Sequence, residues 1–204
     1  VQDSSGLLLF RFNISKPILA SLAREWFLIF PGDSVNVIIT GQKDDRQFQF
    51  QGKNSENYSF FLALKEIPKF NLQAWQFTDY SELSKFRNQA REHYLSTLTI
   101  LESYIARNHT ADNFNQIARS LLITAYANNL IYPINLGNLS KENLPPGYLS
   151  DIDYQFLNQP ELMIFRDYVL VLTYFNKFYS DLHHSNFYDS TFVRSRLESI
   201  RKNF

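Results

Sequence analysis

The residue types best suited to chemistry gather near the C-terminus, where His183 and His184 lie between Asp181 and Asp189. Histidine and aspartate bind metals, but two ligands on one helix usually stand about four residues apart so that they face the same way. Adjacent histidines point in different directions, and the surrounding segment has the polarity of a loop. The sequence therefore favours a solvated loop here, with a metal site or a histidine-dependent enzyme as the alternative.

Other catalytic patterns are missing from the sequence. It contains no cysteine, which excludes thiol catalysis, disulfides and cysteine-based metal centres within this chain. Its six glycines form neither a phosphate-binding loop nor a Gly-x-Ser-x-Gly turn. The acid pairs at 44/45 and 151/153 stand in predicted turns, where carboxylates commonly accept backbone N–H groups. We expect no catalytic residue, cofactor or metal in this chain.

Charge and hydropathy narrow the class of protein further. The 20 basic and 20 acidic side chains give a net charge of zero, so no basic field attracts a nucleic-acid backbone. The longest stretch of the apolar region 162–179 that contains neither a charged residue nor asparagine is 168–175, whereas a membrane-spanning helix needs about 20 apolar residues. These features predict a soluble globular chain that neither binds nucleic acid nor crosses a membrane.

The composition is rich in aromatic residues, with 19 Phe and 12 Tyr. Most of them fall on predicted inward-facing stripes and are expected to form the core. Rigid aromatic side chains in loops make efficient contacts with a partner, and one group of them stands in or near predicted loops. The candidate partner-contact residues are Tyr148, Tyr154, Phe156, Phe187 and Tyr188.

The first third of the sequence predicts strands. Apolar and polar residues alternate over 8–14 and again over 46–51, which is the period of a half-buried strand. The runs 26–30 and 34–40 are apolar and are separated by a Pro-Gly-Asp turn. Pro17 is expected to end the first strand or mark an edge, because proline donates no hydrogen bond. A sheet that begins so early is expected to have lost its first strands.

The remainder predicts helices. Asn54 is the expected N-cap of a helix over 54–66, and Asp79 with Glu82 resembles a capping box for a long helical span over 83–105, as one bent helix or two. A helix from Asp112 is expected to end near Pro133, and residues 134–159 are expected to form a loop. Pro160 suits the first position of a helix, the stretch 162–179 predicts a central helix, and a last helix starts near 191.

These elements predict an α+β fold, with a small antiparallel β-sheet or half-sandwich followed by an α-helical segment. We place the sheet region at residues 1–53 and the helical region at residues 54–204.

Short motifs within this pattern resemble a known family. The order Phe30-Pro31-Gly32-Asp33, then a polar hairpin, then Gly52-Lys53-Asn54 leading into a helix is similar to the N-terminal region of the TlpA/ResA-like thiol-disulfide oxidoreductases of Bacteroidetes. The segment around Phe165 to Tyr168 also looks like a helix found late in that region. The resemblance spans roughly residues 6–204. It implies an exported protein, periplasmic or lipid-anchored in the cell envelope, whose thioredoxin-like domain follows this segment.

This chain departs from the family pattern in the residues that carry out catalysis. The family's activity rests on a Cys-x-x-Cys pair, and this chain has no cysteine, so no catalytic role is carried over. The leading hypothesis is a non-catalytic accessory region that positions a thioredoxin-like domain or helps select its protein or peptide substrates. The alternative is a stand-alone envelope binding protein for a peptide or glycan.

Overall fold

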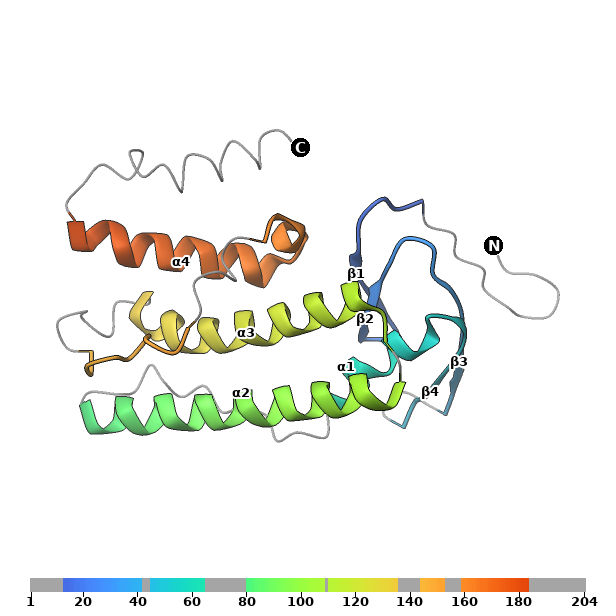
Figure 1. Cartoon of the computed structure of the whole chain (residues 1–204), viewed down its shortest axis with the longest axis horizontal. Helices are drawn as coiled ribbons and strands as arrows, with labels where there is room; N and C mark the ends of the chain where they lie inside the picture. Colours follow the sequence, from blue (N-terminus) through green and yellow to red (C-terminus); the bar gives the residue numbers. More distant parts are fainter. Residues whose placement is uncertain are drawn as a thin grey trace. The chain divides into compact units, whose positions relative to one another are not determined.

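The computed structural model of the chain describes residues 13–41, 45–64, 80–108, 110–135, 144–152 and 159–183. Within them the fold is α+β, as the sequence predicts: two antiparallel two-stranded sheets are followed by three long helices (Figure 1). The chain divides into two compact units, residues 1–61 and 62–204, so the boundary expected after residue 53 stays a prediction. The predicted strand over 8–14 falls almost entirely outside the described residues, as do Asp79 and the predicted helix from 191.

Unit 1 begins with a hairpin that the sequence did not predict. Strand β1 (Ile18–Leu22) starts directly after Pro17 and pairs with β2 (Glu25–Ile29), with Leu22 opposite Glu25. Pro17 therefore directly precedes an edge strand, while the strand that it was expected to end lies almost entirely outside the described residues. The connecting residues Ala23 and Arg24 both have positive φ, 52° and 73°. Positive φ at both central positions is the requirement of a two-residue hairpin turn, which usually uses glycine or asparagine.

The second hairpin agrees closely with the alternation in the sequence. Strand β3 (Ser34–Thr40) pairs with β4 (Gln47–Lys53), from Ser34 opposite Lys53 to Thr40 opposite Gln47. The inner face carries Phe48 and Phe50, and the glutamines between them are exposed. Arg46 donates from Nη1 to the carbonyl of Ala23 at 3.1 Å, which joins this hairpin to the turn of the first.

Four aromatic rings form a cluster in unit 1. Phe27 of β2 lies 5.7 Å from Phe48 and 5.5 Å from Phe50, and Phe50 lies 5.6 Å from Tyr58. Phe27 and Tyr58 are almost fully buried. Each such ring pair contributes about 0.5–1.5 kcal/mol beyond its buried area. Tyr58 ends the 3₁₀ helix η1 (Ser55–Tyr58), which leads into the short helix α1 (Phe60–Ala63), so no single helix runs through 54–64.

Unit 2 is built on three helices, α2 (Tyr80–Asn108), α3 (Asp112–Asn135) and α4 (Arg166–His183). Helix α3 packs against both α2 and α4 (Figure 1). Because α3 has neighbours on two sides, it buries residues on opposite faces, such as Tyr126 and Ile117. The apolar stripe of α2 is buried at Leu83, Phe86 and Ala90. This stripe belongs to one continuous helix, the first of the two arrangements left open by the sequence.

Two helix boundaries differ from expectation. Helix α3 continues past Pro133 to Asn135, since a proline two residues before the end removes a single backbone bond of the last turn. The predicted helix over 162–179 is instead a 3₁₀ helix η6 (Pro160–Ile164), a break at Phe165 and then α4. Phe165 has an extended backbone, with φ −95° and ψ 119°, and its carbonyl accepts the N–H of Val169. Among the described helices, none has the length and apolarity needed to cross a bilayer.

Candidate functional site

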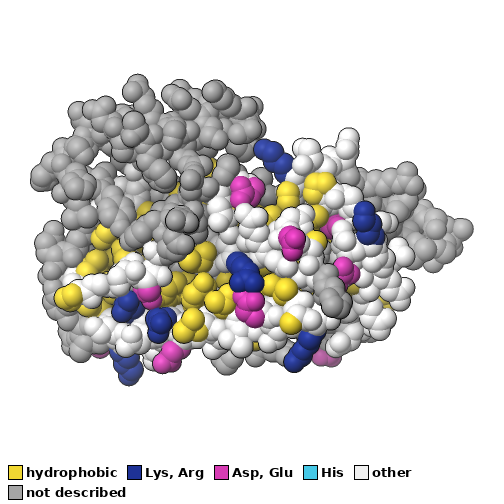
Figure 2. Space-filling model, viewed as in Figure 1, with side chains coloured by type: hydrophobic (Ala, Val, Ile, Leu, Met, Phe, Trp, Pro, Cys, Tyr) yellow, Lys and Arg dark blue, Asp and Glu magenta, His cyan; other side chains and the backbone are white. Residues whose placement is uncertain are grey.

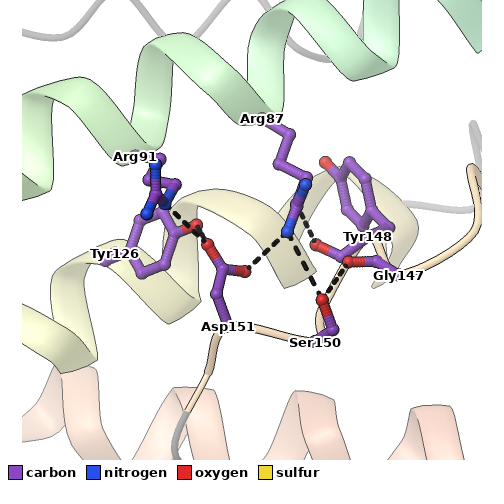
Figure 3. Close-up of polar contacts among 7 residues, drawn as sticks. All are labelled: Arg87, Arg91, Tyr126, Gly147, Tyr148, Ser150 and Asp151. Carbon is purple, nitrogen blue, oxygen red and sulfur yellow. Dashed lines mark hydrogen bonds and ion pairs between the residues drawn. The ribbon is translucent and has the colours of Figure 1, made fainter.

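The main polar cluster of unit 2 surrounds the carboxylate of Asp151. This residue lies in a series of turns over 144–152, hereafter the turn segment, which follows α3 in the chain. Figure 3 shows the turn segment facing Arg87 and Arg91 of α2 and Tyr126 of α3. Arg87 and Arg91 stand four residues apart, so they project from one face of the helix on successive turns. Side chains from two helices thus converge on one carboxylate.

Arg87 donates hydrogen bonds to three acceptors in the turn segment. Its Nε donates to the carbonyl of Tyr148 at 3.0 Å, and its Nη2 donates to Asp151 Oδ1 at 3.1 Å and to Ser150 Oγ at 3.5 Å (Figure 3). The Arg87 and Asp151 side chains are about one-quarter exposed. An ion pair of this kind lies between a surface pair, worth up to about 1 kcal/mol, and a fully desolvated one. Arg87 therefore fixes the position of the turn segment against α2.

The second oxygen of Asp151 is also occupied. Tyr126 donates its hydroxyl to Oδ2 at 2.7 Å, and Arg91 Nε lies 3.5 Å from the same atom. Burial, followed by the hydrogen bond and charge of Asp151, raises the pKa of Tyr126 above its ordinary value of 10.0, although the two arginines oppose the shift. The hydroxyl thus stays protonated near neutral pH and can donate. Both oxygens of Asp151 are engaged as acceptors, which suits binding and positioning better than proton transfer.

The turn segment is organised largely by its own short-range bonds. The N–H groups of Tyr148, Ser150 and Ile152 each donate to the carbonyl three residues earlier, and Ser150 Oγ donates to the carbonyl of Gly147. Gly147 has φ +70°, a value that favours glycine. The segment is therefore a compact set of turns that meets α2 chiefly through the Arg87 side chain.

Tyr148 occupies an unexpected place in this arrangement. Its side chain is 2% exposed, and its hydroxyl finds no hydrogen-bond partner in the described structure. Burial raises the pKa of Tyr148, with Arg87 opposing. A buried hydroxyl without a partner destabilises a fold by about 1–3 kcal/mol. Tyr148 lies in a turn, as the sequence predicts, but its ring is in the interior.

Unit 1 has a polar junction of its own, centred on Asp33. The Oδ2 atom of Asp33 accepts the N–H of Phe30 at 2.9 Å and the hydroxyl of Tyr58 at 3.1 Å, while Oδ1 accepts the Asn54 side chain at 2.6 Å. Asn54 has φ +65°. Its amide therefore binds Asp33 across the hairpin, and it makes no side-chain cap for η1. Asp33 ties the start of β3 to the end of β4 and to the following helix.

Glycine is required at one position of this junction. Gly52 has φ +121°, and a Cβ atom there would lie 2.2 Å from the carbonyl oxygen of Ser34. No side chain fits at that distance. The Gly-Lys-Asn order singled out in the sequence thus has a local structural explanation.

Most other residues considered from the sequence lie elsewhere or outside the described range. The residues that lie outside it are Tyr154, Phe156, Phe187, Tyr188, His184, Asp189, Asp44 and Asp153. His183 ends α4. Within the described residues, no group of three His, Asp or Glu side chains is placed to hold a metal. Asp151 binds the side chains of Arg87, Arg91 and Tyr126, in place of the backbone contact expected of a turn carboxylate.

The sequence did not single out Arg87, Arg91 or Ser150. The spacing of Arg87 and Arg91 on one helix face was the available signal, but their partner stands 64 residues further along from Arg87. Figure 2 shows acidic and basic side chains interspersed on its visible face of the described residues. Such mixed surfaces give little indication from sequence of which pairs will meet.

No protein-family model matches this sequence, and no curated protein and no solved structure is significantly similar to it. The resemblance to the TlpA/ResA-like family therefore stays a prediction from short motifs.

Proposed function

We propose that this chain is a non-catalytic accessory region of an exported thiol-disulfide oxidoreductase of the TlpA/ResA-like type, periplasmic or lipid-anchored in the cell envelope. In this role it positions a thioredoxin-like domain or helps select the protein and peptide substrates of that domain. The redox step requires a thiolate nucleophile, and the sequence contains no cysteine. The contribution of these 204 residues is therefore shape and contacts.

The observation that supports this proposal is the meeting of two short motifs at Asp33. Pro31-Gly32-Asp33 and Gly52-Lys53-Asn54 are far apart in the sequence, yet Asp33 and Asn54 share a 2.6 Å hydrogen bond. Ser34 pairs with Lys53 and Val35 with Gly52 in the same hairpin. The motifs that carry the resemblance thus form one joint between hairpin and helix.

The alternative is a stand-alone envelope binding protein for a peptide or glycan, and one observation favours it. Trp26 of β2 is 55% exposed, and exposed tryptophan is a frequent anchor in binding surfaces. If this alternative holds, Trp26→Ala weakens binding of a peptide or glycan to the isolated chain. The same change at exposed Leu95 of unit 2 serves as the control.

The proposed function is tested with the full-length gene product. We expect it to reduce both a small disulfide, oxidised glutathione, and a disulfide-bonded protein. Because Asp33 organises the accessory region, Asp33→Ala should raise KM for the protein substrate and leave the rate with oxidised glutathione unchanged. Asp45→Ala, an exposed acid of the same unit, is the matched control. Equal rates for both substrates in Asp33→Ala and wild type would argue against the proposal.

A further inference from the structure

The three side chains that hold Asp151 are anchored on helices α2 and α3. Arg87 and Arg91 are fixed one helical turn apart on α2. Tyr126 of α3 stacks on Tyr94 of α2, with ring centroids 5.0 Å apart and an interplanar angle of 14°. Three donors are therefore positioned by the packing of two long helices. The carboxylate comes from the separate turn segment.

Among the described residues, the charges in this site are not balanced. Two guanidinium groups face one carboxylate, and Arg91 is 54% exposed with its Nε 3.5 Å from Oδ2. Arg91 is thus a largely exposed donor whose contact with Asp151 is long. Arginine suits planar carboxylates because its N–H groups form a rigid fork.

An ion pair that joins α2 to α3 provides a contrast. Arg119 contacts both oxygens of Glu102, with Nη2 2.8 Å from Oε2. That pair joins one charge to one charge, and both residues belong to helices. It is an ordinary ion pair between two helices. In the Asp151 site, by contrast, two arginines of one helix meet a carboxylate of the turn segment.

We propose that Arg87, Arg91 and Tyr126 form a binding site for an acidic side chain of a partner peptide, and that Asp151 occupies this site in cis. The turn segment then acts as an internal competitor. An incoming carboxylate takes the donors of Arg87, Arg91 and Tyr126, and the turn segment moves away from α2. The site needs no thioredoxin-like partner, because every group that forms it lies in unit 2.

The Tyr148 hydroxyl supports displacement of the turn segment. This group is buried without a hydrogen-bond partner in the described structure, so release of the segment would return it to water. A ligand whose site is open for only a fraction of the time binds with an affinity reduced by that fraction. Removing the internal competitor should therefore strengthen binding.

The test uses the complete 204-residue chain and a fluorescein-labelled peptide of alternating glycine and glutamate. Fluorescence anisotropy gives Kd, and the same peptide with glutamine in place of glutamate shows the need for charge. We expect Asp151→Ala to lower Kd for the acidic peptide by at least about tenfold relative to wild type. Adding Arg91→Gln to Asp151→Ala should abolish this gain. Adding Arg107→Gln, an exposed arginine on the same helix, should not.

Two control variants distinguish binding at this site from a general effect of net charge and from misfolding. Glu102→Ala makes the same change in net charge and frees Arg119, so an equal gain in that variant would overturn the proposal. Asp151→Asn keeps the shape of the side chain and should shift Kd in the same direction as Asp151→Ala. In wild type, saturating acidic peptide should speed hydrogen exchange across residues 144–152. Unchanged exchange there, or equal binding of the glutamine peptide, also contradicts the proposal.

Discussion

Replacing Asp33 with alanine is the sharpest perturbation of unit 1. The carboxylate accepts three hydrogen bonds, from the Phe30 N–H, the Asn54 amide and the Tyr58 hydroxyl, at 2.9, 2.6 and 3.1 Å. Tyr58 is 5% exposed, so its hydroxyl would lose its partner in a mostly buried position. A hydrogen bond to a charged group contributes about 1.5–3 kcal/mol, and a buried polar group left unpaired costs about 1–3 kcal/mol.

These contributions do not add, because they share one carboxylate that is partly exposed to water. We expect Asp33→Ala to lower the free energy of unfolding of unit 1 by about 2–4 kcal/mol. Tyr58→Phe removes one bond and leaves the other two in place. It should therefore cost about 1 kcal/mol.

The assay is urea unfolding followed by tryptophan fluorescence in a Trp75→Phe background, where Trp26 of β2 is the remaining tryptophan. Its signal reports on unit 1. Asp45→Ala changes the charge equally but alters an exposed residue, and should stay within about 0.5 kcal/mol of wild type. A loss below about 0.5 kcal/mol for Asp33→Ala would refute the role of Asp33 as the junction of β3, β4 and η1.

Three further results are expected. Tyr148→Phe removes a hydroxyl that has no partner in the described structure. Thermal unfolding should therefore show unit 2 unchanged or stabilised by up to about 1 kcal/mol. A clear loss of stability would reveal an unseen partner of this hydroxyl. Gly52→Ala combines φ +121° with a close contact to the Ser34 carbonyl, so it should lower the free energy of unfolding in urea by more than about 2 kcal/mol. Gly32→Ala, with φ +82° and its nearest contact at 3.8 Å, should lower it by about 1 kcal/mol. Because the pKa of Tyr126 is raised in the folded state, the unfolded chain loses this proton first, so stability should be intact below about pH 10 and fall at higher pH. Tyr126→Phe should flatten the fall in stability above about pH 10, and an identical slope in wild type and variant would contradict this expectation.

Local alternation and turn composition predicted much of unit 1. Residues 46–51 alternate clearly and residues 34–40 form an apolar run, and the corresponding strands form there. The first hairpin was missed because its turn, Ala23-Arg24, contains neither glycine nor asparagine at its positive φ positions. Its stabilisation comes partly from Arg46, which stands 23 residues away and binds the Ala23 carbonyl. Only the folded chain shows that contact.

The candidate site was harder to predict from the sequence, because its contacts also join residues that are far apart in the chain. The helical stripes of α2 and α3 predict which faces are buried, but not which polar groups from the turn segment meet them. Asp151 was recognised as a turn residue, while its partners Arg87 and Arg91 had no local signal that distinguished them from other surface arginines. Tyr148 illustrates the converse. A tyrosine beside Pro-Pro-Gly suggests a surface position, and only packing against the helices places it inside.

We propose that these residues serve a redox protein without performing its chemistry. The most direct measurement is to read the coding sequence in frame beyond Phe204 and assay the encoded protein for disulfide reduction. We expect a thioredoxin-like domain with a Cys-x-x-Cys pair and reductase activity that is lost when those cysteines are replaced by serine. A protein without such a domain, or one that reduces no disulfide, would argue against the proposed function.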